Sequence, residues 1–429
     1  MIDLDIGFFK IDITPPVGVR LGGYGHRLGL SSTHIIDPLF LRVLYLSNRS
    51  GEAVVIAQLD LLGLYRDDAD VIREILSKRL GVKREDVMIA TTHTHSAPET
   101  IIPMWTHTFP YTEEQRELYD SWRKILFEKT GEVSEDLVYT VSRVVSMRSG
   151  SRKVPGLCFN RAFRDGLIDD ELSIIGFESR DLRVVVANYA CHPVTNVSLG
   201  ISADYPGEIH YQLSRRGIET IFLTGACGDI DPIQKGVRYM IYLGSVLSEE
   251  ILSLYLTSRE EIYSEDLSSS MEEITFGVRR PSRSISELMR DYETLRNLYK
   301  DPRNLLFDSS WMDLLYLDEE LDLAEKKINE IKTILQIIRI GDKNLVIGIP
   351  GEILSETSIE LKKNLRDMGY MNILVSTYTN DYIGYIPIER SFLENKYEAR
   401  LAKWSFVERD AERKLREKIL DVVKRLKLK

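Results

Sequence analysis

Two histidines have the residue type and the spacing of metal ligands. His93 and His95 lie two residues apart in the run ATTHTHSAPET, directly after the apolar run VMIA. In an extended segment, residues i and i+2 point to the same side, so both imidazoles can reach one ion. Imidazole is a frequent zinc ligand. A polar turn that follows a strand is the alternative interpretation of this pair.

Polar clusters follow several other strand-like runs. His192 in ACHP follows LRVVVANYA, and Glu352 in PGE follows NLVIGI. The other members of these clusters are Asp229 and Asp231 after ETIFLTG, and Asp381, Tyr382 and Tyr385 after NILVSTYT. Ligands of α/β sheets bind outside the carboxyl ends of the strands. If the strands are parallel, these residues meet at one edge of the sheet.

Two histidines and one glutamate form a known ligand set of catalytic zinc, which leaves one position for water. In that arrangement, one histidine of the HTH pair binds the metal and the other contacts the substrate or a neighbouring group. Each cluster also has a structural interpretation. ACHP can be a turn, the glutamate of PGE suits the start of a helix, and the aspartates of GDIDP can cap backbone amides.

The strand and helix patterns predict that parallel strands position these residues. Residues 40–48, 52–60 and 87–92 have strand patterns, and residues 67–81 have a helical pattern that ends in glycine. The order strand, helix, strand predicts a βαβ unit with a parallel pair. Later strand patterns cover residues 182–190, 219–225, 344–350 and 372–379.

We expect one domain, residues 1–429, with an α/β fold. The core is a mixed β-sheet flanked by helices, with the active-site residues at the C-terminal ends of the strands. Residues 240–342 have long charged helical patterns, such as LYLDEELDLAEKKINEIKTILQII, and predict a helix-rich insertion that covers a late strand pair. Residues 398–427 are amphipathic with a basic end, which predicts a long C-terminal helix.

Composition narrows the classes of function. The chain has 429 residues, of which 43% are hydrophobic, enough for a large buried core. A formal net charge of −10 argues against a nucleic-acid partner or a membrane-surface protein, which would show a basic face. No apolar run approaches the roughly 20 residues that span a bilayer, so we expect no transmembrane segment. The sequence does not determine the oligomeric state.

The N-terminus predicts a cytoplasmic protein, and the cysteines predict no disulfide framework. The run MIDLDIGFFK has two aspartates before its hydrophobic residues and no basic start, so we expect no signal peptide and a cytoplasmic protein. The three cysteines, Cys158, Cys191 and Cys227, contain no C-x-x-C pair. They predict neither a disulfide framework nor a cysteine zinc site, and buried free thiols are expected.

Taken together, these motifs resemble the neutral/alkaline, non-lysosomal ceramidase family. The resemblance runs from the N-terminus to about residue 400, in the family's order, and is weakest over residues 240–340. The matching pieces are DITPPVGV, GGYG, THTHSAP, FNRA, ANYACHPVTN, SADYPG, GACGDIDP, IPGE and TNDYIGYIPIERSFLENKYEA. Each piece is short, and the ordered combination carries the specificity.

The resemblance implies a zinc-dependent hydrolase that cleaves an N-acyl amide bond by attack of a metal-activated water. It implies one zinc ion per chain and a small-molecule or lipid-like N-acyl substrate. The zinc ligands that it implies are His93, His192, Glu352 and Tyr385. The residues that it places at the substrate amide are His95, Arg161 and Tyr397.

The chain also departs from the family pattern. The family's GDVSP has a catalytic serine, and here GDIDP has Asp231. Asp231 could be a general base, could orient His95, could bind a second cation with Asp229, or could cap a turn. The family's SGDNKG becomes SADYPG, and the threonine pair after the ligand tyrosine becomes Pro387 and Ile388. We expect no secretory signal and no C-terminal immunoglobulin-like domain.

Three other functions fit parts of the pattern. A zinc hydrolase could act on a non-ceramide amide or an ester. A two-metal phosphoesterase is suggested by four aspartates that follow strands, Asp60, Asp204, Asp229 and Asp231. A catalytically inactive homologue that binds a metal or a ligand is the third alternative.

Overall fold

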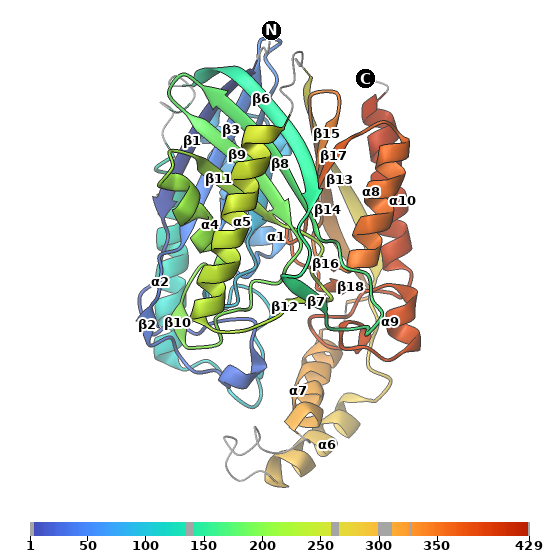
Figure 1. Ribbon diagram of the computed structural model, residues 1–429. Coiled ribbons are helices and arrows are strands. Elements are labelled where there is room, and N and C mark those ends of the chain that lie inside the picture. The colour runs from blue at the N-terminus through green and yellow to red at the C-terminus, as the bar shows by residue number, and fades with distance from the viewer. Residues whose placement is uncertain are drawn as a thin grey trace.

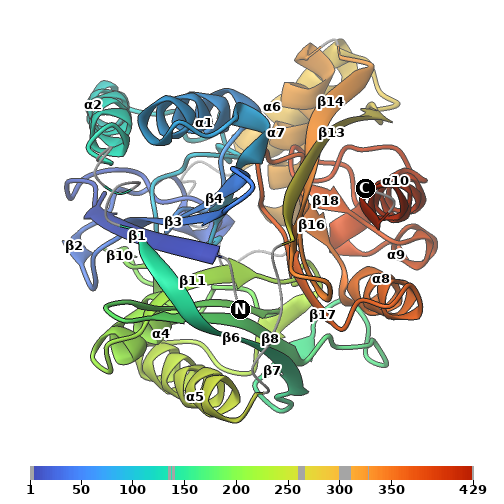
Figure 2. The ribbon, with the colours of Figure 1, turned by 90° about the horizontal axis from the view of Figure 1, so that it is seen from above.

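Two β-sheets form the centre of the computed structural model, which describes residues 4–133, 137, 141–258, 266–298, 311–326 and 328–427. The larger sheet has the strand order β11 (Glu219–Thr224), β9 (Arg183–Tyr189), β8 (Glu171–Ser179), β6 (Ser142–Lys153), β1 (Leu4–Asp12), β3 (Phe40–Asn48), β4 (Ala53–Leu59) and β5 (Val87–Thr91). The smaller sheet has the order β13 (Leu267–Gly277), β14 (Glu330–Ile340), β15 (Asn344–Gly348) and β17 (Asn372–Ser376). Seen from above, the two sheets surround a common interior (Figure 2).

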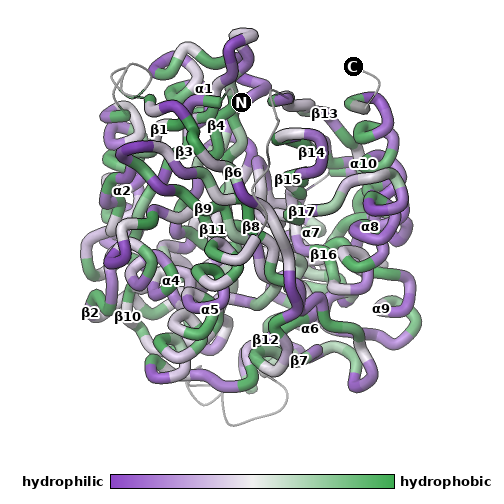
Figure 3. Tube along the Cα trace, turned by 45° about the horizontal axis from the view of Figure 1, so that its top comes forward, coloured by the Kyte–Doolittle hydropathy of each residue, from purple (hydrophilic) through white to green (hydrophobic). Residues whose placement is uncertain are grey.

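The interior between the sheets is a single apolar cluster. It contains Leu44, Ile56 and Val186 from the larger sheet and Val346 and Leu374 from the smaller one, all fully buried. Hydrophobic residues therefore dominate the strands at the centre, and hydrophilic residues lie along the outer helices (Figure 3). Burial of this apolar surface is the main favourable term that holds the two sheets together.

Helices cover the outer faces of the sheets (Figures 1 and 2). The helix bounds are α1 (Arg66–Leu80), α2 (Glu113–Thr130), α4 (Asp204–Ser214), α5 (Val237–Thr257), α6 (Ile285–Leu298), α7 (Trp311–Glu325), α8 (Ser355–Asp367), α9 (Glu389–Leu393) and α10 (Ala411–Lys427). Helices α1 and α2 pack on β3 and β4, α4 and α5 on β9 and β11, and α8 and α10 on the smaller sheet. The fold class is therefore α/β with a mixed sheet core, as predicted.

Three parallel strand pairs confirm the geometric basis of the sequence analysis. β4 pairs with β5, β9 with β11, and β15 with β17, each in parallel. β5 (VMIAT) is buried at every residue, as expected for a parallel strand covered on both faces. The helix α1 between β4 and β5 has Asp67 and Asp68 in its first turn and ends at Gly81 in the left-handed conformation.

Three short strand pairs lie outside the two main sheets, and the second and third of them adjoin the site. They are β2 (His34–Ile35) with β10 (Gly200–Ile201), β7 (Cys158–Asn160) with β12 (Ile230–Pro232), and β16 (Glu352–Ile353) with β18 (Tyr385–Ile386). The 3-10 turns are Gly25–Arg27, Arg84–Asp86 and Tyr397–Ala399.

The helix-rich character predicted for residues 240–342 is only partly correct. Residues 330–340, which were expected to continue a helix, form the long strand β14, and α7 ends at Glu325. The run TILQIIRI is rich in isoleucine, whose branched side chain favours a strand, and it is buried between β13 and β15. Residues 259–265, 299–310 and 327 of this prediction lie outside the described residues.

The C-terminal helix is shorter than residues 398–427, because α10 begins at Ala411. The preceding segment contains the turn Tyr397–Ala399 and the bridge between Ala402 and Ser405. Trp404 is fully buried there and stacks on Tyr397 with a ring separation of 5.7 Å. Tertiary packing of the tryptophan therefore overrides the helical pattern of this segment.

Among the described residues, no helix combines the length and the apolar composition needed to cross a bilayer. Cys158, Cys191 and Cys227 are buried free thiols.

Candidate metal centre

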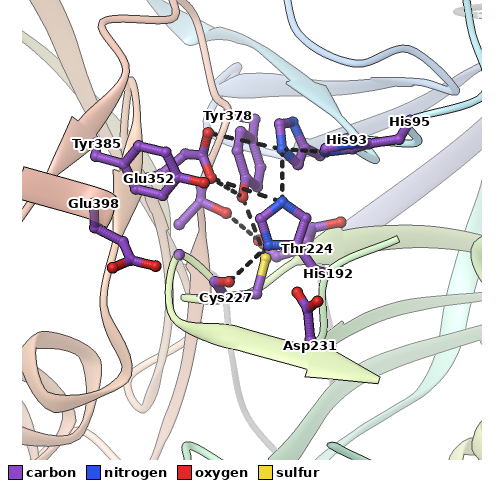
Figure 4. A network of polar contacts seen from close by, with 12 residues as sticks. His93, His95, His192, Thr224, Cys227, Asp231, Glu352, Tyr378, Tyr385 and Glu398 are labelled. Carbon is purple, nitrogen blue, oxygen red and sulfur yellow. Dashed lines mark hydrogen bonds and ion pairs between the residues drawn. The ribbon is translucent and has the colours of Figure 1, made fainter. Parts of the chain in front are cut away.

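The three parallel pairs bring His93, His192 and Glu352 to one point, although the residues are far apart in the chain. His93 follows β5, His192 follows β9, and Glu352 begins β16 after β15. The Nε2 atoms of His93 and His192 are 3.1 Å apart. Glu352 Oε1 lies 3.8 Å from Nε2 of His93, and its Oε2 lies 3.8 Å from Nε2 of His192 (Figure 4).

Backbone carbonyls determine the tautomers of the two histidines. Nδ1 of His93 is 2.5 Å from the carbonyl oxygen of Leu62, and Nδ1 of His192 is 2.9 Å from that of Cys227. Because a carbonyl oxygen only accepts, each Nδ1 carries the proton and each Nε2 presents a lone pair. Two lone pairs that face each other at 3.1 Å repel, and a cation between them removes that repulsion. The donor set therefore fits a metal ion.

Burial keeps both rings neutral, as metal ligation requires. Desolvation lowers the pKa of His93 to about 3, and it lowers the pKa of His192 well below the usual value. The positive charge of Arg161 lowers both pKa values further. The rings consequently remain unprotonated at neutral pH and keep their lone pairs directed at the site.

Glu352 is held by tyrosines on the other side of the site. Tyr382 donates a hydrogen bond of 2.5 Å to Oε1, and Tyr378 donates one of 3.2 Å to Oε2. Burial raises the pKa of Glu352 to about 7, and the hydrogen bond from Tyr382 opposes that rise. Tyr378 also stacks flat on His93, with ring centroids 3.7 Å apart. These contacts fix the carboxylate and the imidazole relative to each other.

Tyr385 lies opposite Glu352 in the register of β16 and β18. Its hydroxyl accepts a hydrogen bond of 2.8 Å from Arg161. Hydrogen bonding from Tyr385 is among the contacts that oppose the rise in the pKa of Glu352 caused by burial. Tyr385 is thus placed beside Glu352.

Arg161 is anchored on four sides. It bonds to Asp231 at 3.0 Å, to the carbonyl oxygen of Gly228 at 2.8 Å, to Tyr385, and to Glu398 at 3.3 Å. Asp231 pairs through its other oxygen with Lys235 at 3.1 Å. Both oxygens of Asp231 are therefore ion-paired, and the carboxylate holds two cations at the rim of the site.

His95 is the third histidine at this point. Its Nε2 is 3.2 Å from Nε2 of His93, and its Nδ1 is buried with no hydrogen-bond partner in the described chain. Gly23 packs directly against the ring, and a Cβ atom at that position would collide with it. His93, His95 and His192 together form a group of potential metal ligands whose atoms lie within 4.8 Å of one another.

A cavity of about 540 Å³ opens over His95, Arg161 and Asp231. Tyr385 and Tyr397 form part of its wall, with ring centroids 5.8 Å apart in an edge-to-face arrangement. The apolar part of its lining is Met104, Val194, Met312, Leu315 and Trp404, and the polar part also includes Tyr24, His26, Lys235, Lys396 and Glu398. All eight residues proposed from the sequence therefore meet at one place: His93, His95, Arg161, His192, Asp231, Glu352, Tyr385 and Tyr397.

The four aspartates of the phosphoesterase alternative do not share a site. Asp60 pairs with Arg42 at 2.6 Å, and Asp204 accepts from Thr195 at 2.5 Å. Asp229 accepts from the amide of Ser355 at 2.9 Å at the start of α8, and from Asn160. Among the described residues, none of these aspartates belongs to a group of potential metal ligands.

Several site residues escaped the sequence analysis. Tyr378 was not singled out, and Tyr382 was named only as a member of the polar cluster after the strand, because nothing in the run marks either tyrosine as a partner of Glu352. Gly23 lies in GGYG, and its packing on His95 depends on a tertiary contact. Lys235 follows the motif GACGDIDP, and Glu398 lies within the last of the matching motifs; their proximity to Asp231 and Arg161 is likewise a property of the fold.

The architecture can be compared with solved structures. The neutral ceramidase from Pseudomonas aeruginosa superposes with a TM-score of 0.73 at 15% sequence identity, over 97% of this chain and 73% of that chain. The chain has the neutral ceramidase fold. A second structure, a ceramidase complexed with C2, superposes on this fold with a TM-score of 0.72 at 14% identity, over 97% of this chain and 74% of that chain.

Comparison of the sequence itself gives no match: no family model and no curated protein matches it. The resemblance to neutral ceramidases is nevertheless confirmed at the level of the fold, which covers nearly the whole chain.

Proposed function

We propose that the protein is a zinc-dependent amidohydrolase that cleaves the N-acyl bond of a small-molecule or lipid-like substrate. The observation that carries this proposal is the convergence of two unprotonated Nε2 atoms, from His93 and His192, with Glu352 beneath an open cavity. The ceramidase fold supports the same reaction class by analogy. One metal site of nitrogen and oxygen donors suits zinc.

The residues that would hold the ion are His93, His192, Glu352 and Tyr385. When bound there, a zinc ion supplies a Lewis acid and lowers the pKa of a coordinated water toward neutrality. His95 is the alternative fourth ligand, since its Nε2 is as close to His93 as His192 is. In the primary assignment, His95 faces the cavity and donates to the substrate.

The side chains around the cavity have complementary tasks. The hydroxyl of Tyr397 and the ring of His95 line the cavity and would donate to the substrate carbonyl oxygen as negative charge develops on it. Arg161 holds the hydroxyl of Tyr385 and adds a fixed positive charge. Asp231 holds Arg161 and Lys235, so we assign it a positioning role in place of the family's serine.

Metal analysis and a substrate panel test the proposal together. Purified protein should contain about one zinc ion per chain, and His93→Ala or His192→Ala should remove it. His34→Ala, which changes an exposed histidine outside the site, is the control and should leave the zinc content unchanged. The wild type should hydrolyse at least one member of a panel of ceramides, short N-acyl amines and esters.

The outcomes separate the alternatives. Full zinc content in both variants would refute the metal site. Loss of zinc in the variants with no turnover by the wild type on the whole panel would favour an inactive metal-binding homologue. Turnover of esters alone would retain the zinc hydrolase and exclude the amide substrate.

A further inference from the structure

A second cavity of about 400 Å³ lies away from the metal centre, between α4, the start of α5 and the strands β1 and β3. None of the residues that line it lines the catalytic cavity. Figure 1 shows α4 and α5 side by side on this flank of the larger sheet. The polar residues that line this second cavity indicate which class of molecule it would bind.

His210 on α4 is the unusual residue of this cavity. Its side chain is buried, with the residue 7% exposed, and neither ring nitrogen has a hydrogen-bond partner in the described part of the chain. Burial lowers the pKa of His210 well below its usual value, and the nearby charges of Arg42 and Lys10 lower it further. The ring is thus a neutral imidazole with one N–H to donate. Because buried polar groups of native proteins are almost always paired, the ring lacks a partner that the protein does not supply.

Arg42 is the second group with donors to spare. It is buried, its Nη1 bonds to Asp60 at 2.6 Å, and its guanidinium lies over the ring of Phe40. Its Nε and Nη2 groups make no hydrogen bond to any described residue. Arginine with free donors in a fork geometry is suited to a carboxylate.

The acidic side chains of the cavity already have partners. Asp37 accepts from the hydroxyl of Ser202 at 2.5 Å and from the amide of Ala203 at 2.7 Å. Glu219 is paired with Lys10 at 2.7 Å, and Glu208 accepts from Gln212 at 2.5 Å. The buried side chain of this cavity that lacks any partner is His210, whose neutral ring offers one N–H donor and one acceptor nitrogen.

The remaining wall is apolar and reaches the surface. It includes Ile36, Phe40, Val237, Met240 and Ile241, and Ile241 is 46% exposed at the mouth. A volume of 400 Å³ with a few convergent polar groups falls within the usual range of small-molecule sites, about 300–1,000 Å³.

We propose that this cavity binds a monocarboxylate with an apolar body. The carboxylate accepts from the N–H of His210 and from the free donors of Arg42, while the apolar body lies against Phe40 and Met240. Binding at this cavity does not depend on the proposed hydrolase function. Only the identification of the ligand with a reaction product rests on that function, because amide hydrolysis releases a carboxylate of this class. The start of α5 would connect the two sites, since Lys235 lines the catalytic cavity and Val237 lines this one.

Calorimetric titration with octanoate, and with 1-octanol as the uncharged counterpart, tests the proposal. Octanoate should bind saturably at one site per chain and 1-octanol more weakly. His210→Phe should abolish octanoate binding. Ile241→Asp should weaken it by about fivefold or more, because it adds a like charge at the mouth. Tyr242→Asp is the matched control, since Tyr242 is similarly exposed at 54% on the same helix but does not line the cavity, and it should bind octanoate like the wild type.

His192→Ala separates this site from the metal centre, where a bound ion could also attract a carboxylate. Octanoate binding should persist in that variant, whatever becomes of the hydrolase activity. Equal binding of octanoate and 1-octanol, equal effects of Ile241→Asp and Tyr242→Asp, or loss of binding in His192→Ala would each overturn the proposal. A dimer of the wild type that Ile241→Asp dissociates would assign this face to a second copy of the chain and overturn it as well. If His210→Phe fails to fold, the comparison of octanoate binding between Ile241→Asp and Tyr242→Asp still tests the proposal.

Discussion

The fixed tautomers of His93 and His192 direct the lone pairs of both rings at the same point. Each ring donates from Nδ1 to a backbone carbonyl, so the lone pairs at Nε2 are already directed at one point before any ion arrives. Glu352 is held in the same way by Tyr378 and Tyr382. Such preorganisation reduces the cost of ordering ligands on binding.

The hydrogen bond from Tyr382 to Glu352 should strengthen metal binding. Tyr382→Phe should weaken zinc affinity about 10–100-fold, because the carboxylate loses the donor that orients it. Competition with a chromogenic chelator measures this affinity. Tyr239→Phe is the control, since Tyr239 donates to the carbonyl oxygen of Leu157 far from Glu352. Equal zinc affinity in wild type and Tyr382→Phe would show that this bond has no part in the metal site.

The role of Asp231 can be separated from that of a general base. Asp231→Asn keeps the shape but removes one charge from the pairs with Arg161 and Lys235. For a positioning residue, we expect a loss in kcat/KM of about tenfold, unchanged zinc content and a pH profile of unchanged shape. Loss of a general base would instead cost about 10²–10⁴-fold in rate and would change the shape of the pH profile. The second result would reassign Asp231 to proton transfer.

At the scale of elements, the site depends on short segments beyond the strand ends. The pair β16 and β18 puts Glu352 opposite Tyr385, and the pair β7 and β12 puts Arg161 and Asp231 within bonding distance. The loop that contains Gly23 supports His95 from behind. Loops and strand ends on a rigid sheet scaffold are the usual place for functional residues.

Replacement of Gly23 should damage the site more than the fold. Gly23→Ala introduces a Cβ atom that collides with the His95 ring, so the ring must move; displacement of a catalytic group by about 1 Å can cost about 10²-fold in rate. Gly51→Ala is the matched control. Both glycines have φ of 85°, but the Cβ position at Gly51 has no atom within 4 Å. Equal activity in the two variants would show that the contact between Gly23 and His95 does not position the ring for activity.

At the scale of the whole molecule, buried carboxyl groups should make stability depend on pH. Glu319 on α7 is fully buried, with Lys403 at 3.5 Å as its counter-ion. Burial raises the pKa of Glu319 to about 8, and Lys403 only partly opposes this. The folded state therefore retains a proton that the unfolded state has already released. This contribution to stability is present below about pH 4.5 and is lost as the pH rises to about 8.

Glu319→Gln should remove this dependence. We expect the variant to be more stable than the wild type at pH 8.5, by of order 1 kcal/mol, with the difference shrinking toward pH 5. Urea unfolding at the two pH values gives the comparison. Glu128→Gln, at a side chain that is 62% exposed, serves as the control and should change neither value. Greater stability of the wild type at pH 8.5 would contradict the prediction and show that the ion pair with Lys403 outweighs the cost of burying the Glu319 carboxylate.

The sequence predicted those strands whose local pattern of apolar and turn residues is sufficient to define them. The strands around residues 40–60, 87–92, 182–190 and 219–225 were predicted correctly because their apolar runs end at turn residues. The strand β14 was misread because charged residues at its start continue the helical pattern of α7, and only pairing with β13 and β15 decides its conformation. The one-domain organisation and the cytoplasmic location stay predictions.

The sequence by itself determined the residue types, their order and the position of several of them after strands. The resemblance of its motifs to the ceramidase family then selected the eight residues that meet in the fold. Only the tertiary structure decided the tautomers of His93 and His192, the ion pairs of Asp231, and the support of Glu352 by Tyr378 and Tyr382. The physical reason is that hydrogen-bond partners come from segments far apart in the chain. Local periodicity reports which face of an element is buried, and it carries no information on which distant group lies opposite.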